Sequence, residues 1–231
     1  MKKALTYLIA VWACVPALAQ PNRKLTEEPP YERRWIVGLD LGKTLAAAVG
    51  DANADYPLKS DLFFTIEPTL RVESANKRFF WAAQPGFTRF TGAPFGNARL
   101  TMTGGFLKIG AEYRLSPTGA LGLLATTSGW QTGGNFTIPG SAFGAYRAAV
   151  PTRNALAAGL EIRLSEDLRL GPTSLLRFVL RQNNFWRSRT ENSPETPYVP
   201  GIGRYFDLNN SPLSFTMGLS LEYHYYLRGR H

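Results

Sequence analysis

The sequence has little of the chemistry on which many enzymes and metalloproteins depend. Cys14 is the single cysteine, and His224 and His231 are the only histidines. Zinc sites usually draw their ligands from cysteines, histidines and clustered carboxylates. The composition therefore predicts no metal site and no cofactor. One cysteine cannot form a disulfide within the chain, and we expect no thiolate nucleophile.

Long hydrophobic runs are also scarce, and the one near the start has the features of a secretory signal. Lys2 and Lys3 precede an apolar stretch over residues 4–15. Ala17 and Ala19 then place small residues at the two positions that a signal peptidase reads. We therefore expect export of the protein and cleavage after Ala19.

Cleavage there would divide the chain into three parts. Residues 1–19 are the signal peptide, residues 20–33 a periplasmic N-terminal segment, and residues 34–231 the folded domain. The alternatives are an uncleaved membrane anchor and a lipoprotein acylated at Cys14. No run of 18 apolar residues follows the signal, so a membrane-spanning helix is not predicted there.

Alternation of large apolar residues with small or polar ones dominates the folded domain. In residues 213–227 the odd positions are all large and apolar, from Leu213 to Leu227, whereas the even positions are mostly small or polar. This period of two predicts strands and not helices. Eight such segments of mostly ~8–15 residues occur, long enough to cross a bilayer at a tilt: 35–42, 61–72, 79–88, 105–114, 120–128, 154–164, 170–181 and 213–227.

Charged residues in these segments avoid the apolar side of each strand. A charge that faces the middle of a bilayer costs about 2–4 kcal/mol. We therefore expect the apolar side to face lipid and the charged side to face the interior. We predict that the interior charges form one paired network: Asp40, Glu67, Arg71, Lys108, Glu112, Arg114, Glu161, Arg163, Arg177, Arg181 and Glu222.

The lengths of the connections alternate as well. Connections near residues 43–60, 89–104, 129–153 and 182–212 are long, whereas those near 73–78, 115–119 and 165–169 are short. Outer-membrane barrels have long external loops and tight periplasmic turns. The sequence thus predicts an all-β, antiparallel, up-and-down transmembrane β-barrel of eight strands. A soluble β-sandwich or lipocalin-type barrel also alternates. Here, however, one side of the strands carries too many charges to line an apolar pocket, and the other side is too uniformly apolar to face water.

Three segments resemble a family of Gram-negative outer-membrane β-barrel proteins of unknown function: Gly38–Leu41, Gly105–Tyr113 and Tyr198–Arg204. The resemblance extends over about residues 33–228 and is most specific in the third segment. It implies an outer-membrane location and a barrel fold, and it supplies no catalytic residues. The third segment belongs to a loop motif that consists of Tyr198, Pro200, Gly201, Gly203 and Asp207. We expect this motif to be ordered, because proline, glycine and aromatic residues restrict or pack the backbone. We also expect it to fold over the barrel mouth.

Two function classes fit these observations, with a third more distant. The first is a structural or surface-interaction barrel whose loops bind a partner, and the second is a small-solute pore. The third is a barrel hydrolase, because Ser220, Glu222 and His224 share one side of the last strand. Positions two apart lie ~7 Å apart along a strand, so we expect no catalytic site there.

The expected partners follow from the location and the charge. The net charge of +9 at pH 7 suits anionic lipid headgroups better than nucleic acid in an exported protein. We expect contact with outer-membrane lipid and lipopolysaccharide, an unidentified surface or periplasmic partner, and a monomeric state.

Overall fold

A computed structural model describes residues 35–41, 60–75, 77–95, 98–138, 140, 144, 146–188, 198–204 and 213–227. All of them belong to the compact unit Arg33–His231. The predicted signal peptide and the segment 20–33 lie outside the described residues. No helix in the described part of the chain is long and apolar enough to cross a membrane.

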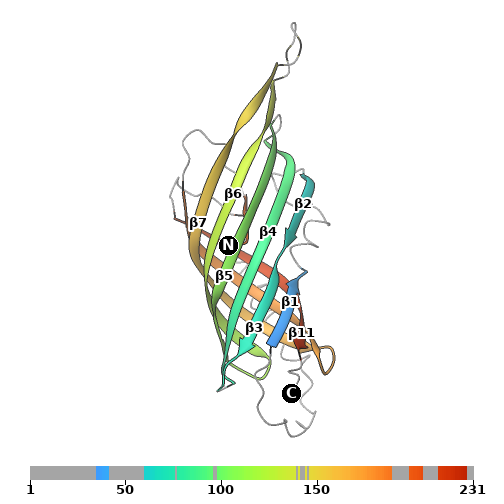
Figure 1. Ribbon diagram of the computed structural model, residues 1–231, viewed down its shortest axis with the longest axis vertical. Coiled ribbons are helices and arrows are strands. Elements are labelled where there is room, and N and C mark those ends of the chain that lie inside the picture. The colour runs from blue at the N-terminus through green and yellow to red at the C-terminus, as the bar shows by residue number, and fades with distance from the viewer. Residues whose placement is uncertain are drawn as a thin grey trace, which may run out of the picture. The chain divides into compact units, whose positions relative to one another are not determined.

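The described residues form eleven strands. Their bounds are β1 Trp35–Asp40, β2 Ser60–Ile66, β3 Pro68–Glu73, β4 Phe79–Phe95, β5 Ala98–Arg114, β6 Gly119–Ile138, β7 Tyr146–Arg169, β8 Ser174–Arg187, β9 Tyr198–Val199, β10 Gly203–Arg204 and β11 Leu213–Leu227. Each predicted segment overlaps a strand of the wall, and the segment 61–72 is divided between β2 and β3 (Figure 1).

The strands close into an antiparallel ring. The order is β2-β4-β3-β1-β11-β8-β7-β6-β5, and pairing of β4 with β5 completes the circle. β2 and β3 are successive parts of one wall position, because both pair with β4 and only Glu67 separates them. The ring therefore has eight positions. The prediction of an eight-stranded, up-and-down antiparallel barrel is confirmed.

The two faces of the wall differ sharply in polarity. Large apolar side chains cover the outside, with Trp81 61%, Ile109 54% and Leu219 75% exposed. The inside instead buries charged side chains, such as Lys108 and Arg163 at 0% exposure. Contiguous apolar surface on this scale is rare on soluble monomers, and buried charges must be paired.

Several strands are longer than the sequence indicated, which corrects two predicted loops. β4 ends at Phe95 and β5 begins at Ala98, so residues 89–104 are mainly strand. β6 continues to Ile138 and β7 begins at Tyr146, which makes most of 129–153 strand as well. Beyond the apolar zone the outward side chains become polar, as at Arg89, Arg99 and Gln131, all exposed. The alternation of hydrophobicity stops there, although the hydrogen-bonded ladder continues.

One short turn also lies elsewhere than expected. The predicted turn at 165–169 belongs to β7, and the chain turns at residues 170–173. Leu170 N and Gly171 N donate to Ser174 O across this turn. Gly171 and Pro172 favour a turn there because glycine is permissive and proline cannot donate to a ladder. Because β7 continues beyond residue 164, Asp167 also lies on the inner face of the wall.

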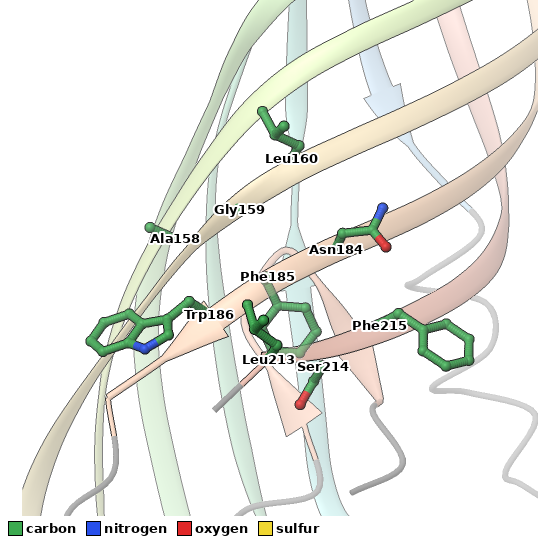
Figure 2. Close-up of a pocket in the computed structure, with 9 residues that line it drawn as sticks. All are labelled: Ala158, Gly159, Leu160, Asn184, Phe185, Trp186, Leu213, Ser214 and Phe215. Carbon is green, nitrogen blue, oxygen red and sulfur yellow. The ribbon is translucent and has the colours of Figure 1, made fainter. Parts of the chain in front are cut away.

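The outer wall carries an apolar groove where β7, β8 and β11 lie side by side (Figure 2). Its volume is about 520 Å³. Outward side chains such as Leu160, Trp186 and Phe215 line it, together with Asn184.

Candidate functional site

The interior of the barrel is the candidate site, because it holds all eleven predicted charges. Ten of them are buried, and only Arg114, at 34% side-chain exposure, reaches solvent. They come from strands all around the ring, so their contacts depend on its closure.

Glu112 on β5 joins three arginines. Its carboxylate lies 2.6 Å from Arg71 Nη2, 3.2 Å from Arg163 Nη1 and 2.7 Å from Arg177 Nη1. Arg177 also binds Asp167 through Nε at 2.6 Å and Nη2 at 3.1 Å, a bidentate contact. Bidentate pairs fix geometry as well as charge.

Lys108 connects this group to the far side of the lumen. Its Nζ lies 2.6 Å from Glu161 Oε2 and 3.0 Å from Glu67 Oε1. Glu161 in turn pairs with Arg163, which donates to Gln84 Oε1 at 2.5 Å. The ammonium of Lys108 thus sits between two carboxylates that would otherwise repel each other.

Arg181 on β8 holds three more carboxylates. It donates to Glu67 at 2.9 Å, to Asp40 at 3.0 Å and to Glu222 at 2.6 Å. Asp40 and Glu222 are directly paired residues of β1 and β11, a like-charge arrangement that destabilises a sheet when it is uncompensated. Arg181 bridges them, and the ion pairs from Asp167 to Asp40 form one connected network.

Arg114 and Arg71 lie near the short-turn end. Arg114 Nη2 is 3.2 Å from Glu73 Oε1. The guanidinium carbons of Arg71 and Arg114 lie 4.3 and 4.8 Å from the centre of the Phe80 ring. A cation over an aromatic face gains electrostatic stabilisation, more so where water is excluded.

Sequence reasoning missed several partners in the interior. Gln84, Glu73 and Asp167 were not assigned to the network, although the alternation of their strands, once extended, points all three inward. Two glycines also make room. A Cβ at Gly122 would lie 2.6 Å from Arg163 Cγ, and one at Gly38 would lie 2.8 Å from two ring atoms of His224.

Ser220, Glu222 and His224 face inward on β11 and are buried. The hydroxyl of Ser220 bonds to Asp40 Oδ2, whereas His224 Nε2 lies 2.7 Å from Glu222 Oε2. The serine therefore hydrogen-bonds a carboxylate on another strand and not the imidazole. The imidazole is thus engaged by Glu222, and the carboxylate beside Ser220 is itself bound by Arg181.

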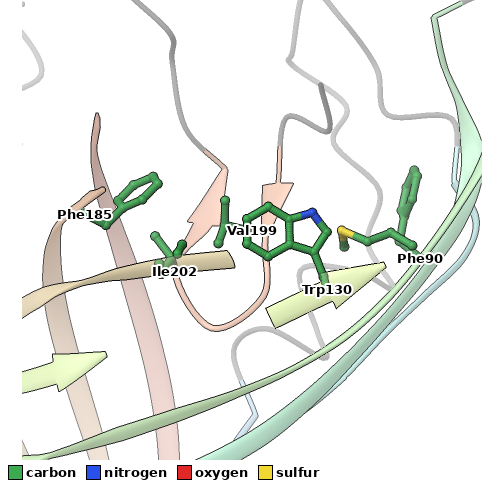
Figure 3. Close-up of a cluster of buried hydrophobic side chains, with 7 residues drawn as sticks. Phe90, Trp130, Phe185, Val199 and Ile202 are labelled. Carbon is green, nitrogen blue, oxygen red and sulfur yellow. The ribbon is translucent and has the colours of Figure 1, made fainter. Parts of the chain in front are cut away.

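A small hairpin, β9–β10, occupies the interior on the long-strand side of the network. Val199 and Ile202 are 0% and 5% exposed, in a cluster with Phe90, Met102, Trp130, Ala157 and Phe185. Figure 3 shows the hairpin lying between these wall residues. Asn183 Nδ2 and Thr216 Oγ1 both donate to Ile202 O, at 3.3 and 3.1 Å.

The glycine and proline of this hairpin explain how it fits. Gly201 has φ of +74°, which disfavours side chains, and a Cβ there would overlap the Phe106 ring. Pro200 packs against the wall, because a Cβ at Gly104 would lie 2.8 Å from Pro200 Cγ. The hairpin thus lies within the barrel. The motif residue Asp207 falls outside the described residues.

Comparisons with known proteins give only remote likenesses. No protein-family model matches the sequence, and no curated protein matches it. Among solved structures, the outer membrane protein Ail of Yersinia pestis is 11% identical, with 85% of this chain and 100% of that chain covered and a TM-score of 0.37. The β domain of the Bordetella autotransporter BrkA is 9% identical, with 85% and 99% covered and a TM-score of 0.39. The assignment of a barrel fold therefore follows from the strand pairing of this chain itself.

The interior is thus filled at two levels, by ion pairs and by an apolar hairpin. No group of three or more histidine, cysteine or acidic side chains within the described ranges is arranged to hold a metal ion. The carboxylates of the network are instead held by arginine and lysine. Chemically, this arrangement joins strands through ion pairs that reach across the interior.

Proposed function

We propose that the protein spans the outer membrane of a Gram-negative bacterium as a closed barrel with a structural or surface-interaction role. In this role it presents its long hairpins to an external partner. The apolar outer face supports the membrane location, because it would expose a large hydrophobic surface in water. Export through a signal cleaved after Ala19 would bring the chain to that membrane.

The orientation follows from the two ends of the barrel. At one end the strands join through short turns, such as residues 115–118 and 170–173. At the other end β6 and β7 extend well past the last pairing of β7 with β8, between Ala157 and Arg187 (Figure 1). Outer-membrane barrels keep short turns in the periplasm and long excursions outside, so the β6–β7 hairpin would project from the cell.

The filled interior is the observation that carries the closed-barrel proposal. Eight strands leave an interior just wide enough for side chains to fill. Here Arg163 and Arg181 pair with acids across the lumen, and Val199 and Ile202 close the space toward the long hairpins. A solute would have to displace both layers, so a small-solute pore is the weaker alternative. The bonds of Ser220 and His224 likewise favour a structural role over hydrolysis.

Conductance in planar bilayers tests this proposal. We expect the purified protein to show no steady ion current. A Val199→Ser/Ile202→Ser variant should also remain closed, because the ion-pair layer persists when the hairpin is loosened. Steady channels in the wild-type protein would overturn the closed-barrel proposal in favour of the pore. Channels in the double variant alone would show that the hairpin by itself closes the barrel, and the ion-pair layer would then not be a barrier.

A further inference from the structure

Two amide side chains interrupt the apolar outer face of β8. Gln182 and Asn184 both point outward and are exposed. Their cross-strand neighbours are apolar on both sides: Ile162 and Met217 flank Gln182, and Leu160 and Phe215 flank Asn184. Amides that face hydrocarbon without a hydrogen-bond partner cost free energy, so their position calls for a ligand.

The two amides satisfy each other only in part. Gln182 Nε2 lies 3.5 Å from Asn184 Oδ1. This contact does not engage Gln182 Oε1 or Asn184 Nδ2, an acceptor and a donor. The pair thus offers one donor side and one acceptor side. A ligand group with both a hydrogen to donate and an oxygen to accept complements it.

The apolar groove adjoins these amides. Asn184 lies in its lining between Leu160 of β7 and Phe215 of β11, and Trp186 and Leu213 continue it along the wall (Figure 2). Its volume of about 520 Å³ is within the ~300–1,000 Å³ of small-molecule sites. Its lining is mostly apolar, which suits a flexible apolar chain.

The depth of the amides favours a lipid linkage group. Trp186 is 48% exposed on the outer face, and outward tryptophans concentrate at the membrane interface. Asn184 lies two residues farther down the strand, about 7 Å along it. This is just below the interface on the long-hairpin side, where the linkages between headgroup and acyl chains lie.

We propose that this groove binds an acyl chain of lipid A, the outer-leaflet lipid whose chains carry amide and hydroxyl groups. The inference rests on the proposed outer-membrane location. The chain lies along Leu160, Leu213 and Phe215, and its amide or hydroxyl group hydrogen-bonds Asn184 and Gln182. Ester-linked phospholipids offer acceptors but no donor at this depth, so they fit the amide pair less well. A second copy would have to insert a protruding element, whereas this face presents a hollow.

The test uses the full-length mature barrel folded into phosphatidylcholine vesicles, with and without lipid A. After transfer to detergent, native mass spectrometry counts the lipid A molecules retained, and urea unfolding measures the stabilisation. We expect one retained lipid A and a higher unfolding midpoint in its presence. In Gln182→Leu/Asn184→Leu, binding should weaken on the order of tenfold, which corresponds to about 1.4 kcal/mol.

Thr103→Leu is the matched control, because it exchanges an exposed polar residue for leucine on the outer face of β5. This variant should bind lipid A as the wild type does. Equal binding by the double variant, or equally tight and equally amide-dependent binding of phosphatidylethanolamine, would overturn the lipid A assignment. Disulfide dimers of Leu160→Cys or Phe215→Cys in vesicles would assign the groove to a second copy.

Failure of the membrane proposal itself would look different. In that case the wild-type protein would not fold into the vesicles, whereas failure of the groove assignment leaves a folded barrel that treats both lipids alike.

Discussion

Arginine is the principal cation of the interior, and its shape accounts for the contacts. Arg181 reaches Glu67 through Nη1 and both Asp40 and Glu222 through Nη2. A planar guanidinium can serve several carboxylates at once, whereas lysine acts as a compact point charge. Lys108 bridges Glu67 and Glu161. Arg181 thereby joins carboxylates from three wall positions in one contact group.

Arg177→Leu should lower the free energy of unfolding by roughly 3 kcal/mol, because it removes one cation from a buried ion-pair network. Glu112 and Asp167 would each lose a partner. Urea unfolding of the barrel from lipid vesicles measures the change. Leu176→Ala, one residue along β8 and on the outer face, should cost less because lipid fills part of the space. Equal losses in the two variants would show that the network does not stabilise the barrel.

Gly201→Ala should destabilise the hairpin within the barrel by about 1–2 kcal/mol or more, the cost of a left-handed backbone for an L-residue. The new Cβ would also meet the Phe106 ring. Limited proteolysis of the hairpin and the emission of Trp130, which packs against it, report the change. Gly218→Ala is the control, since nothing lies within 4 Å of its Cβ. A hairpin equally resistant in both variants would contradict this reading.

At the scale of elements, hydrophobic alternation depends on the environments of the two faces of a strand, whereas strand length depends on backbone hydrogen bonding. Alternation records the solvents on the two faces, so it ends where the outer face leaves the apolar zone. Hydrogen bonding continues, with β6 paired from Gly119 to Ile138. The predicted loops at 89–104 and 129–153 were wrong for this reason. Gly171 and Pro172 are the opposite case, because these turn-forming residues lie within the segment 170–181 that the sequence predicts as a strand.

The amides of residues 130–136 should therefore exchange slowly with deuterium, unlike those of a loop. This part of β6 pairs with β5 on one side and β7 on the other. Residues 147–150 of β7 pair only with β6 among the described residues, so faster exchange is expected there. Hydrogen-exchange mass spectrometry compares the two segments in one experiment. Fast exchange throughout 130–136 would mean that the extension is not a stable ladder.

At the scale of the whole molecule, closure joins strands that are distant in the sequence. Trp35 of β1 pairs with Leu227 of β11, so the first and last wall strands meet. Each strand of the wall is then hydrogen-bonded to a neighbour on both sides around the apolar zone. A closed sheet removes the unpaired edges that would be costly in lipid.

Closure also predicts heat-modifiable migration. The unheated barrel should run faster on detergent gels than the boiled chain, because the ring stays compact until heat breaks its ladders. Deletion of β11, residues 213–227, opens the ring between β1 and β8 and should abolish the shift. Identical migration of boiled and unheated wild-type protein would argue against a closed barrel under these conditions.

The period of two, together with the placement of the charges and the alternating lengths of the connections, was sufficient to predict a β-barrel and which side of each strand faces inward. This was possible because the side chains of each strand alternate in polarity according to the two environments that the strand separates. Glu161 and Arg163 alternate with Leu160 and Ile162, and nothing beyond the strand is needed to read that pattern. The composition of residues 198–204 also indicated an ordered segment.

Only the tertiary structure decided which charges meet and where the hairpin lies. Arg177 of β8 reaches Glu112 of β5 at 2.7 Å, although two strands of the wall separate them. Gly201 fits beside Phe106 only because β9–β10 turns into the lumen. Strand order and ring closure set these distances across the lumen, and no pattern within a single strand contains them.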